Sequence, residues 1–155
     1  MCESLLVYTM RRSIGMERSL ILLKPDAIEN GVMGEIISRL ENLGIRFLAA
    51  KILNVTQDLA MHHYSDHVGK PFFDGLVDFI TSNPIMALVV EGNDVIDMVR
   101  TKMGATNPQD ATPGTIRADL AESIDRNLIH GSDSKASAQK EINLFFLPEE
   151  LVTHR

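Results

Sequence analysis

The sequence contains a single cysteine, Cys2, and no tryptophan among its 155 residues. One cysteine cannot form a disulfide within the chain or supply a cysteine zinc site, which excludes the disulfide-rich secreted class and favours a cytoplasmic location. No apolar run approaches the roughly 20 residues that a membrane-spanning helix requires, so no membrane partner is expected. The formal net charge is −6. Because nucleic-acid binding depends on clustered cationic contacts to phosphates, this acidity gives no basis for a specific nucleic-acid partner.

The familiar glycine-rich phosphate-binding loops are absent as well. Gly69-Lys70 is followed by Pro71 and has no glycine five positions upstream, so it is not a P-loop, and no G-x-G-x-x-G fingerprint occurs. A phosphate site in this chain would therefore be built from side chains. The suitable cations are Lys24, Arg100 and Arg117, which only the fold can bring together.

The length suits one domain, which at 155 residues can bury about two-thirds of the surface of its unfolded chain. The first fifteen residues differ from the rest. Their apolar stretch, from Leu5 to Tyr8, is too short for a signal-peptide core, and Arg11 and Arg12 follow it instead of preceding it. We expect residues 1–15 to be a disordered or non-native extension without chemistry, and residues 16–155 to form the domain.

Strand-like and helix-like patterns alternate from residue 18 onward. Short apolar runs bounded by proline or glycine predict strands at 19–23, 45–55, 85–90 and 127–130. Apolar residues at helical spacing, with capping residues before them and glycine after them, predict helices at 32–43, 56 to about 67, 71–80, 95–103, a turn at 118–123, and a helix from about 134. The core order is strand, helix, strand, strand, helix, strand.

The most informative segment is Asn127-Leu128-Ile129-His130-Gly131-Ser132-Asp133. An apolar run broken at Gly131 predicts a buried strand that ends abruptly, and residues 132–134 suit the N-cap of the next helix. A strand end beside a helix N-terminus is a natural place to bind an anion, and a neutral imidazole at His130 can act as a nucleophile toward a phosphoryl group. On this pattern alone, a hydrogen-bonded structural histidine is the simpler interpretation.

Three further segments change that balance: Leu22-Leu23-Lys24-Pro25-Asp26, Arg100 to Pro108, and Thr112 to Asp119. With the His-Gly-Ser-Asp stretch they closely resemble the nucleoside diphosphate kinase family over residues 17 to about 150. The resemblance implies a ferredoxin-like α+β sandwich with a four-stranded antiparallel sheet, which the core order matches. It also implies ping-pong transfer of the γ-phosphate of a nucleoside triphosphate, typically ATP, to a nucleoside diphosphate through a phosphohistidine on His130, which maintains the NTP and dNTP pools.

The resemblance assigns further roles residue by residue. Lys24 matches the lysine that reaches phosphate and ribose beside the histidine. Tyr64 matches the tyrosine near the histidine, Glu141 the carboxylate that orients its ring, and Ser132 belongs to the signature stretch. The residues that match nucleotide contacts are Arg100, Thr106 and Arg117 for the diphosphate, Asn127 for the sugar, and Phe72, Leu76 and Ile124 for the base. The resemblance also implies Mg²⁺ held mainly by the nucleotide phosphates, without protein ligands, and a tetramer or hexamer built from dimers.

Each of these residues has a plainer interpretation. An isolated lysine or arginine, or Glu141 on a helix, is usually a solvated surface charge, and Thr106 and Asn127 can serve ordinary turn hydrogen bonding. Phe72 and Leu76, four positions apart, would normally belong to the core. At the level of the whole chain, the alternatives are a catalytically silent nucleotide-binding module and a nucleic-acid-binding regulator.

The cluster His62, His63 and His67 invites a metal-site interpretation, because His63 and His67 are one helical turn apart. The zinc-protease motif requires a glutamate directly after the first histidine, and Tyr64 stands there instead. We therefore interpret the three histidines as a solvated helix face.

Overall fold

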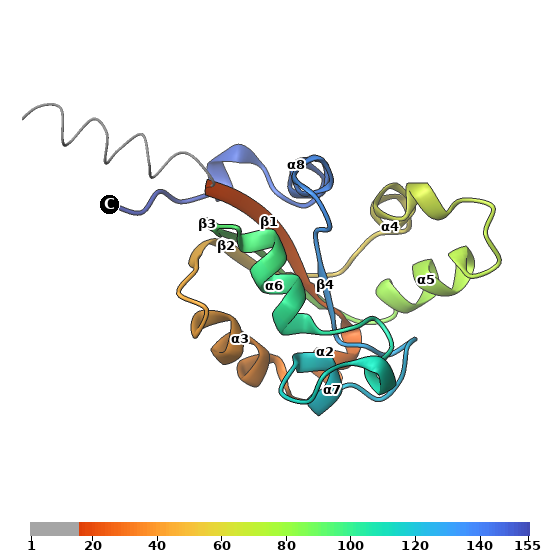
Figure 1. Cartoon of the computed structure of the whole chain (residues 1–155). Helices are drawn as coiled ribbons and strands as arrows, with labels where there is room; N and C mark the ends of the chain where they lie inside the picture. The colour runs from red at the N-terminus through yellow and green to blue at the C-terminus, as the bar shows by residue number, and fades with distance from the viewer. Residues whose placement is uncertain (1–15) are drawn as a thin grey trace, which may run out of the picture.

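The computed structural model describes residues 16–155, so the extension expected at residues 1–15 lies outside the described residues. Its elements appear in chain order in Figure 1. The strands are β1 (Met16–Leu23), β2 (Arg46–Leu53), β3 (Ile85–Asn93) and β4 (Ile129–Gly131). The α-helices are α2 (Pro25–Glu29), α3 (Met33–Glu41), α4 (Gln57–His63), α5 (Phe73–Ile80), α6 (Val95–Met103), α7 (Ile116–Leu120) and α8 (Lys135–Phe145). Single 3₁₀ turns are η1 (Ser65–His67), η2 (Pro108–Asp110) and η3 (Pro148–Glu150).

The four strands form one antiparallel sheet in the order β2-β3-β1-β4. β1 lies inside the sheet and pairs with β3 along its whole length, from Met16 opposite Asn93 to Leu23 opposite Met86. Its residues 20–23 are fully buried because helices cover both faces of the sheet at this point. A continuous apolar run, rather than an alternating one, is the expected sequence for such a strand.

The helices divide between the two faces of the sheet (Figure 1). α3 and α6, the two helices of the core order, pack on one face around Ile21, Leu23 and Val90. α4, α5 and α8 pack on the other face around Leu20, Leu22 and Val89. The predicted α+β, ferredoxin-like fold with a four-stranded antiparallel sheet is confirmed. Among the described residues, no helix is long and apolar enough to cross a membrane.

Three element boundaries differ from the sequence prediction. The helix expected to run to about residue 67 ends at His63, because the backbone of Tyr64 (φ −95°, ψ 21°) leaves the helical region, and a separate 3₁₀ turn follows. The helix expected from residue 71 begins at Phe73, which leaves Phe72 at its N-cap. The turn expected at 118–123 is α7, which begins earlier because the Thr115 hydroxyl caps it by accepting from the Ala118 N–H.

The sequence prediction missed α2 and made β4 too long. Pro25 was interpreted only as a strand end, but it occupies the first turn of α2, where its missing N–H costs nothing. β4 begins at Ile129 and not at residue 127, because Leu128 has φ 74° and its left-handed backbone breaks the ladder.

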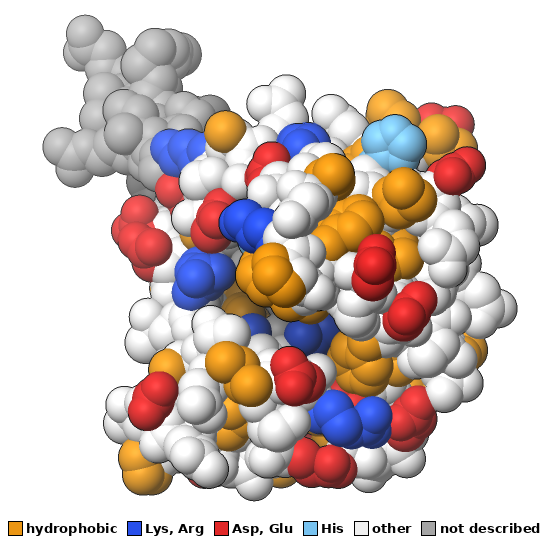
Figure 2. Space-filling model, turned by 90° about the vertical axis from the view of Figure 1, so that its right-hand side faces the viewer, with side chains coloured by type: hydrophobic (Ala, Val, Ile, Leu, Met, Phe, Trp, Pro, Cys, Tyr) orange, Lys and Arg blue, Asp and Glu red, His pale blue; other side chains and the backbone are white. Residues whose placement is uncertain are grey.

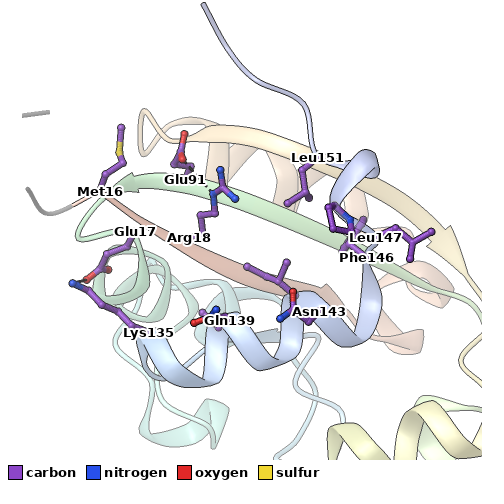
Figure 3. Close-up of a pocket in the computed structure, with 13 residues that line it drawn as sticks. Met16, Glu17, Arg18, Glu91, Lys135, Gln139, Asn143, Phe146, Leu147 and Leu151 are labelled. Atoms are coloured by element: carbon purple, nitrogen blue, oxygen red, sulfur yellow. Dashed lines mark hydrogen bonds and ion pairs between the residues drawn. The ribbon is translucent and has the colours of Figure 1, made fainter. Parts of the chain in front are cut away.

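A groove of about 720 Å³ lies between α8 and the beginning of β1 (Figure 3). Ile142, Phe146 and Leu151 form its apolar part, and Glu17 and Lys135 face one another across 3.7 Å at one end. None of the residues singled out in the sequence lines this groove. Most of those residues line a second cleft, to which Ser137 and Glu141 of α8 contribute.

Candidate active site

A cleft of about 950 Å³ opens between the α4–α5 region and the segment from α6 to β4. Figure 2 shows a hollow on the face that carries α5, with lysine and arginine side chains inside it and apolar side chains around it. Every sequence-selected site residue except Ser132 lines this cleft: Lys24, Tyr64, Phe72, Leu76, Arg100, Thr106, Arg117, Ile124, Asn127, His130 and Glu141. The fold thus collects residues that are more than a hundred positions apart in the sequence.

The floor of the cleft is fixed by a clamp on Leu128. The Lys24 N–H donates to the Leu128 carbonyl at 2.8 Å, and the buried Asp26 carboxylate accepts from the Leu128 N–H at 3.0 Å. These two bonds hold Leu128 in its left-handed conformation, which costs free energy for a residue with a Cβ. Leu22 pairs with His130 in the sheet, and Lys24 follows two residues later, just after the end of β1, so Lys24 and His130 both line the cleft.

His130 is held by a short polar chain. Its Nε2 lies 3.0 Å from Glu141 Oε2, and the Ser132 hydroxyl donates to Glu141 Oε1 at 2.7 Å. Burial raises the pKa of Glu141, but the hydrogen bonds from His130 and Ser132 outweigh burial and hold that pKa below its usual value. An ionised carboxylate can only accept, so Nε2 carries the ring proton and Nδ1 carries the free lone pair. Ser132 lies behind Glu141 and is fully buried, which explains why it does not line the cleft.

The cations of the cleft are unequal in character. Arg117 is 7% exposed and donates to three carbonyls, those of Gly104, Asn127 and Ile129, at 3.1, 3.3 and 2.6 Å. Burial and then the nearby Arg100 lower its pKa to about 10. Arg100 is exposed and, within residues 16–155, its side chain bonds only to the Gly131 carbonyl, at 3.2 Å. Arg117 therefore fixes the walls of the cleft, whereas Arg100 keeps most of its donors free.

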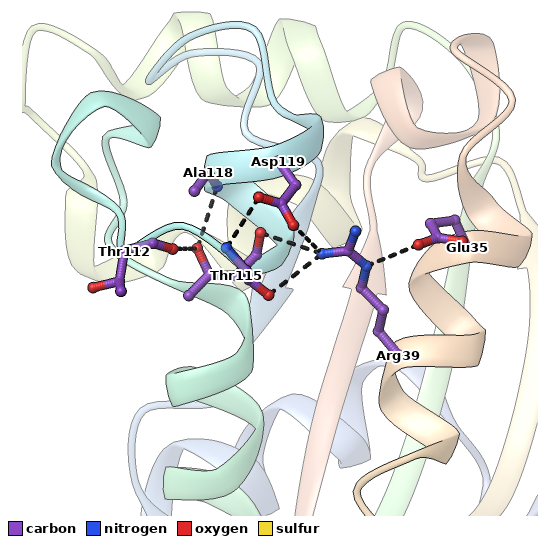
Figure 4. Close-up of polar contacts among 7 residues, drawn as sticks. Glu35, Arg39, Thr112, Thr115, Ala118 and Asp119 are labelled. Atoms are coloured by element: carbon purple, nitrogen blue, oxygen red, sulfur yellow. Dashed lines mark hydrogen bonds and ion pairs between the residues drawn. The ribbon is translucent and has the colours of Figure 1, made fainter.

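The short helix that carries Arg117 is supported from outside the cleft (Figure 4). Arg39 on α3 donates to Asp119 at 2.7 Å and reaches the carbonyls of Gly114 and Thr115 at 3.4 Å. Asp119 in turn accepts from the Gly114 N–H at 3.0 Å. A five-residue helix has little stability of its own, so these contacts position Arg117.

The mouth of the cleft is apolar and open. Phe72 and Ile124 are 51% and 52% exposed, and Leu76 is half-buried beside them. The interpretation of Phe72 as a core residue is wrong, because the helix begins one residue later and leaves this ring outside the packed face. Deeper in the cleft, the Asn127 amide donates to the Thr106 carbonyl at 3.1 Å. Tyr64 is half-buried. Desolvation and then the nearby Glu141 raise the pKa of its hydroxyl to about 12, so the hydroxyl remains a donor at neutral pH.

His63 contradicts the prediction of a solvated histidine face. His62 is exposed, but the His63 ring lies edge-on to His130, with 4.8 Å between ring centroids, and 5.4 Å from the ring of Phe145. Burial and then the neighbouring His130 lower the pKa of His63 to about 3, so it is neutral at pH 7. Helical spacing was the available signal, because Ala60, which is buried, is one turn before His63 and Tyr64.

The geometry agrees with comparisons to known proteins. The sequence profile of the nucleoside diphosphate kinase family matches residues 17–151. The chain belongs to the nucleoside diphosphate kinase family. It is 50% identical over 139 residues to the nucleoside diphosphate kinase of Desulforamulus reducens, covering 90% of this chain and 93% of the relative. It is 53% identical over 137 residues to that of Thermus thermophilus, covering 88% of this chain and 100% of the relative.

A solved structure shows the same fold. The halophilic nucleoside diphosphate kinase from Halobacterium salinarum, in complex with CDP, superposes with a TM-score of 0.88 at 47% identity and covers 90% of this chain and 93% of its own. The activity of the chain is that of a nucleoside diphosphate kinase: transfer of the γ-phosphate of a nucleoside triphosphate to a nucleoside diphosphate. This finding favours the enzyme over the silent module and the nucleic-acid-binding regulator.

Because the chain has nucleoside diphosphate kinase activity, the effect of the charge of Lys24 can be measured from the pH dependence of that activity. Burial and then Arg117 lower the pKa of Lys24 to about 8, although Asp26 and Asp125 oppose this shift. A lysine that binds phosphate must be charged, so we expect kcat/KM to fall as the pH rises through about 8. In Lys24→Arg the guanidinium stays charged, and this fall should disappear. The measurement is kcat/KM against pH for both proteins; identical alkaline limbs would show that Lys24 does not cause the fall.

Proposed function

We propose that His130 carries the phosphoryl group between the two half-reactions of the nucleoside diphosphate kinase. One observation carries the proposal: the ring is fixed through Nε2 by an ionised carboxylate, in a cleft that four lysine and arginine side chains also line. A nucleophile whose proton is held on the far nitrogen presents its lone pair without a separate base. The cations supply the charge that a phosphate requires.

The first half-reaction follows from this arrangement. The Nδ1 lone pair of His130 forms a bond to the γ-phosphorus, and the bond from that phosphorus to the β-phosphate oxygen breaks. The nucleoside diphosphate leaves with the electron pair, and the ring, still protonated on Nε2, carries a positive charge that Glu141 stabilises. A second nucleoside diphosphate takes the same place and receives the group by the reverse path. One site therefore serves donor and acceptor in turn.

The phosphates are bound by side chains because no glycine-rich loop is present. Arg100 and Lys24 have donors that the protein leaves free, and Thr106 is exposed beside them. Phosphoryl transfer needs little covalent help beyond positioning and charge stabilisation, so these groups suffice for the diphosphate. Tyr64, with its hydroxyl protonated, and Asn127, anchored on Thr106, lie in the same cleft and complete the set that we assign to ribose and phosphate.

The residues of the cleft fit a Mg²⁺ ion that arrives with the nucleotide. Among the described residues, the group of His, Cys, Asp and Glu side chains close enough to share an ion is His63, His130 and Glu141, which offers two nitrogens and one carboxylate. Magnesium prefers six oxygen ligands, so the phosphates and water are its natural partners here. When bound, the ion neutralises phosphate charge. The protein contributes Arg100 and Lys24, which hold the same phosphates.

The proposal also assigns the base to the apolar mouth between Phe72 and Ile124. Phe72→Ala should weaken nucleotide binding by roughly 1–3 kcal/mol, with similar losses for purine and pyrimidine nucleotides, because every base has a π-face. Phe72 is 51% exposed at an N-cap and belongs to neither hydrophobic cluster of the described residues, so the midpoint of urea unfolding should not change. Titration with several nucleoside diphosphates measures the losses. An unfolded variant, or one that binds nucleotides as the parent does, would contradict the stacking role.

The direct test of the function is the covalent intermediate. Incubation with ATP and Mg²⁺, with a label in the γ-phosphate, should leave acid-labile, base-stable label on the protein, as expected for an N–P bond. Addition of an unlabelled nucleoside diphosphate should move the label to a nucleoside triphosphate. If exchange between nucleotides proceeds without any label on the protein, direct transfer in a ternary complex replaces this mechanism.

We further propose a cytoplasmic homo-oligomer built from dimers, with NTP and dNTP pools as its substrates. The family supports this proposal, and so does β2, which lies at the edge of the sheet and presents Ile52 at 60% exposure. Light scattering after size exclusion measures the mass and separates a tetramer from a hexamer. Removal of residues 1–15 should leave exchange activity unchanged, since the cleft lies entirely within residues 24–141.

A further inference from the structure

His63, His130 and Glu141 form a cluster whose composition exceeds what the phosphoryl transfer requires. One ring nitrogen from each histidine and one carboxylate oxygen all lie within 4.8 Å of one another. Two imidazoles and a carboxylate are the ligand set of many zinc sites that keep a fourth position open. The same set is poor for Mg²⁺, so the cluster distinguishes between the two ions.

The distances are close to those of a formed site. Zinc binds imidazole nitrogen and carboxylate oxygen at about 2.0–2.1 Å, so the ligand atoms of a tetrahedral site are about 3.4 Å apart. His130 Nε2 and Glu141 Oε2 are 3.0 Å apart and need to move apart only slightly. His63 must approach by no more than roughly 1.4 Å, because the largest distance in the cluster is 4.8 Å. A rotation of its ring within α4 is a movement of that size.

One ring nitrogen of His63 is also available to a cation. The Nδ1 of His63 is buried without a hydrogen-bond partner, an unsatisfied group that a neighbouring ligand or a ring rotation can relieve. The cleft gives access and leaves a fourth position for water or a phosphate oxygen.

We propose that the cleft binds Zn²⁺ through His63, His130 and Glu141, and that the bound ion blocks phosphorylation of the enzyme. This inhibition of phosphorylation rests on the proposed function, and its cause is the position of the ring proton of His130. A neutral imidazole has one N–H proton. When Nε2 binds zinc, that proton must move, through solvent, to Nδ1, which then has no lone pair for the phosphorus. The ion also occupies the place of the Nε2–Glu141 hydrogen bond. Mg²⁺ does not produce this state.

Binding is tested without any turnover. The Cys2→Ser chain serves as the background, because it removes the single thiol. Competition with a chromophoric zinc chelator should show one tightly bound Zn²⁺ per chain. His63→Asn should lower this affinity about tenfold or more, since one of three protein ligands is lost. His62→Asn is the matched control, because His62 is exposed on the same helix and its ring bonds only to the Asp58 carbonyl. Equal zinc affinity in the two variants would overturn the proposed site.

Inhibition is tested on the half-reaction. Phosphorylation of the protein by ATP and excess Mg²⁺ is followed at fixed free zinc, set by a metal buffer, and compared with the metal-free rate of the same variant. We expect zinc to stop labelling in the His62→Asn protein, a chelator to restore it, and His63→Asn to need about tenfold more zinc. Zinc that binds through His63 without slowing labelling would overturn the block. The metal-free labelling tests the proposed function separately, so the two failures are distinguishable.

Discussion

Replacement of His130 by alanine is expected to abolish both protein labelling and nucleotide exchange. The ring supplies the atom that forms the covalent bond, and no neighbouring group can take its place: His63 is edge-on to His130 with its Nδ1 buried, and Tyr64 keeps its proton because its pKa is about 12. Loss of a covalent nucleophile typically lowers kcat by about 10⁴-fold or more. The measurements are incorporation of label from γ-labelled ATP and exchange between ATP and a second nucleoside diphosphate.

The controls separate chemistry from folding. The side chain of His130 is 27% exposed, and its truncation removes one hydrogen bond, to Glu141, and the edge-on contact with His63, so the variant should fold and still bind nucleoside diphosphates. His62→Ala, on the exposed face of α4, should retain the parent rate. A folded His130→Ala protein that exchanges γ-phosphate at the parent rate would remove His130 from the mechanism altogether.

Glu141 connects the two proposals made for His130. A carboxylate behind the ring fixes the proton on Nε2 and leaves Nδ1 nucleophilic, and the same carboxylate places an oxygen 3.0 Å from that nitrogen, where a zinc ion can bind between them. The carboxylate that activates His130 thus also allows Zn²⁺ to bind and inhibit it. His63 is the third ligand of the proposed zinc site, and we assign it no contact with the phosphates.

The sequence predicts the fold well where burial determines it. Residues 20–23 are apolar without interruption because β1 is covered on both faces. Residues 95–103 have helical spacing followed by Gly104, whose φ of 86° only glycine adopts easily. Prediction fails where local backbone geometry decides. Nothing in the sequence indicates that Leu128 takes a left-handed conformation, since its cause is a pair of hydrogen bonds: the Leu128 N–H donates to the Asp26 carboxylate, 102 positions away, and the Leu128 carbonyl accepts from the Lys24 N–H.

The candidate site was predictable as a set of residues and not as a set of contacts. Eleven of the selected side chains line one cleft, and the motifs that selected them are local in sequence. The ring contact of His63 with His130 and the carbonyl contacts of Arg117 depend on how α4 and α7 lie against β4, which no motif records. A sequence-based view of Arg117 as a phosphate ligand alone therefore underestimates its structural role.

Arg117→Ala is expected to reduce stability and turnover together. The sequence alone suggests a loss of turnover with little effect on folding, but the guanidinium donates to the carbonyls of Gly104, Asn127 and Ile129. Removing it leaves buried acceptors without donors, and each bond to a charged group contributes about 1.5–3 kcal/mol. We expect the free energy of unfolding in urea to fall by about 3 kcal/mol or more.

Two further variants determine how much of the effect belongs to each role. Arg18→Ala removes a surface arginine whose side chain is 52% exposed and paired with Glu91, and should change the free energy of unfolding by less than about 1 kcal/mol. Arg117→Lys keeps the charge but cannot reach three carbonyls at once, because an ammonium lacks the planar fork of a guanidinium. The free energy of unfolding of Arg117→Lys should therefore stay low while part of the turnover returns. In Arg117→Ala, turnover should fall on the order of 10²-fold or more. Parent-like stability in both Arg117 variants would show that the three carbonyl contacts do not hold the cleft, and that the residue acts on the phosphates alone.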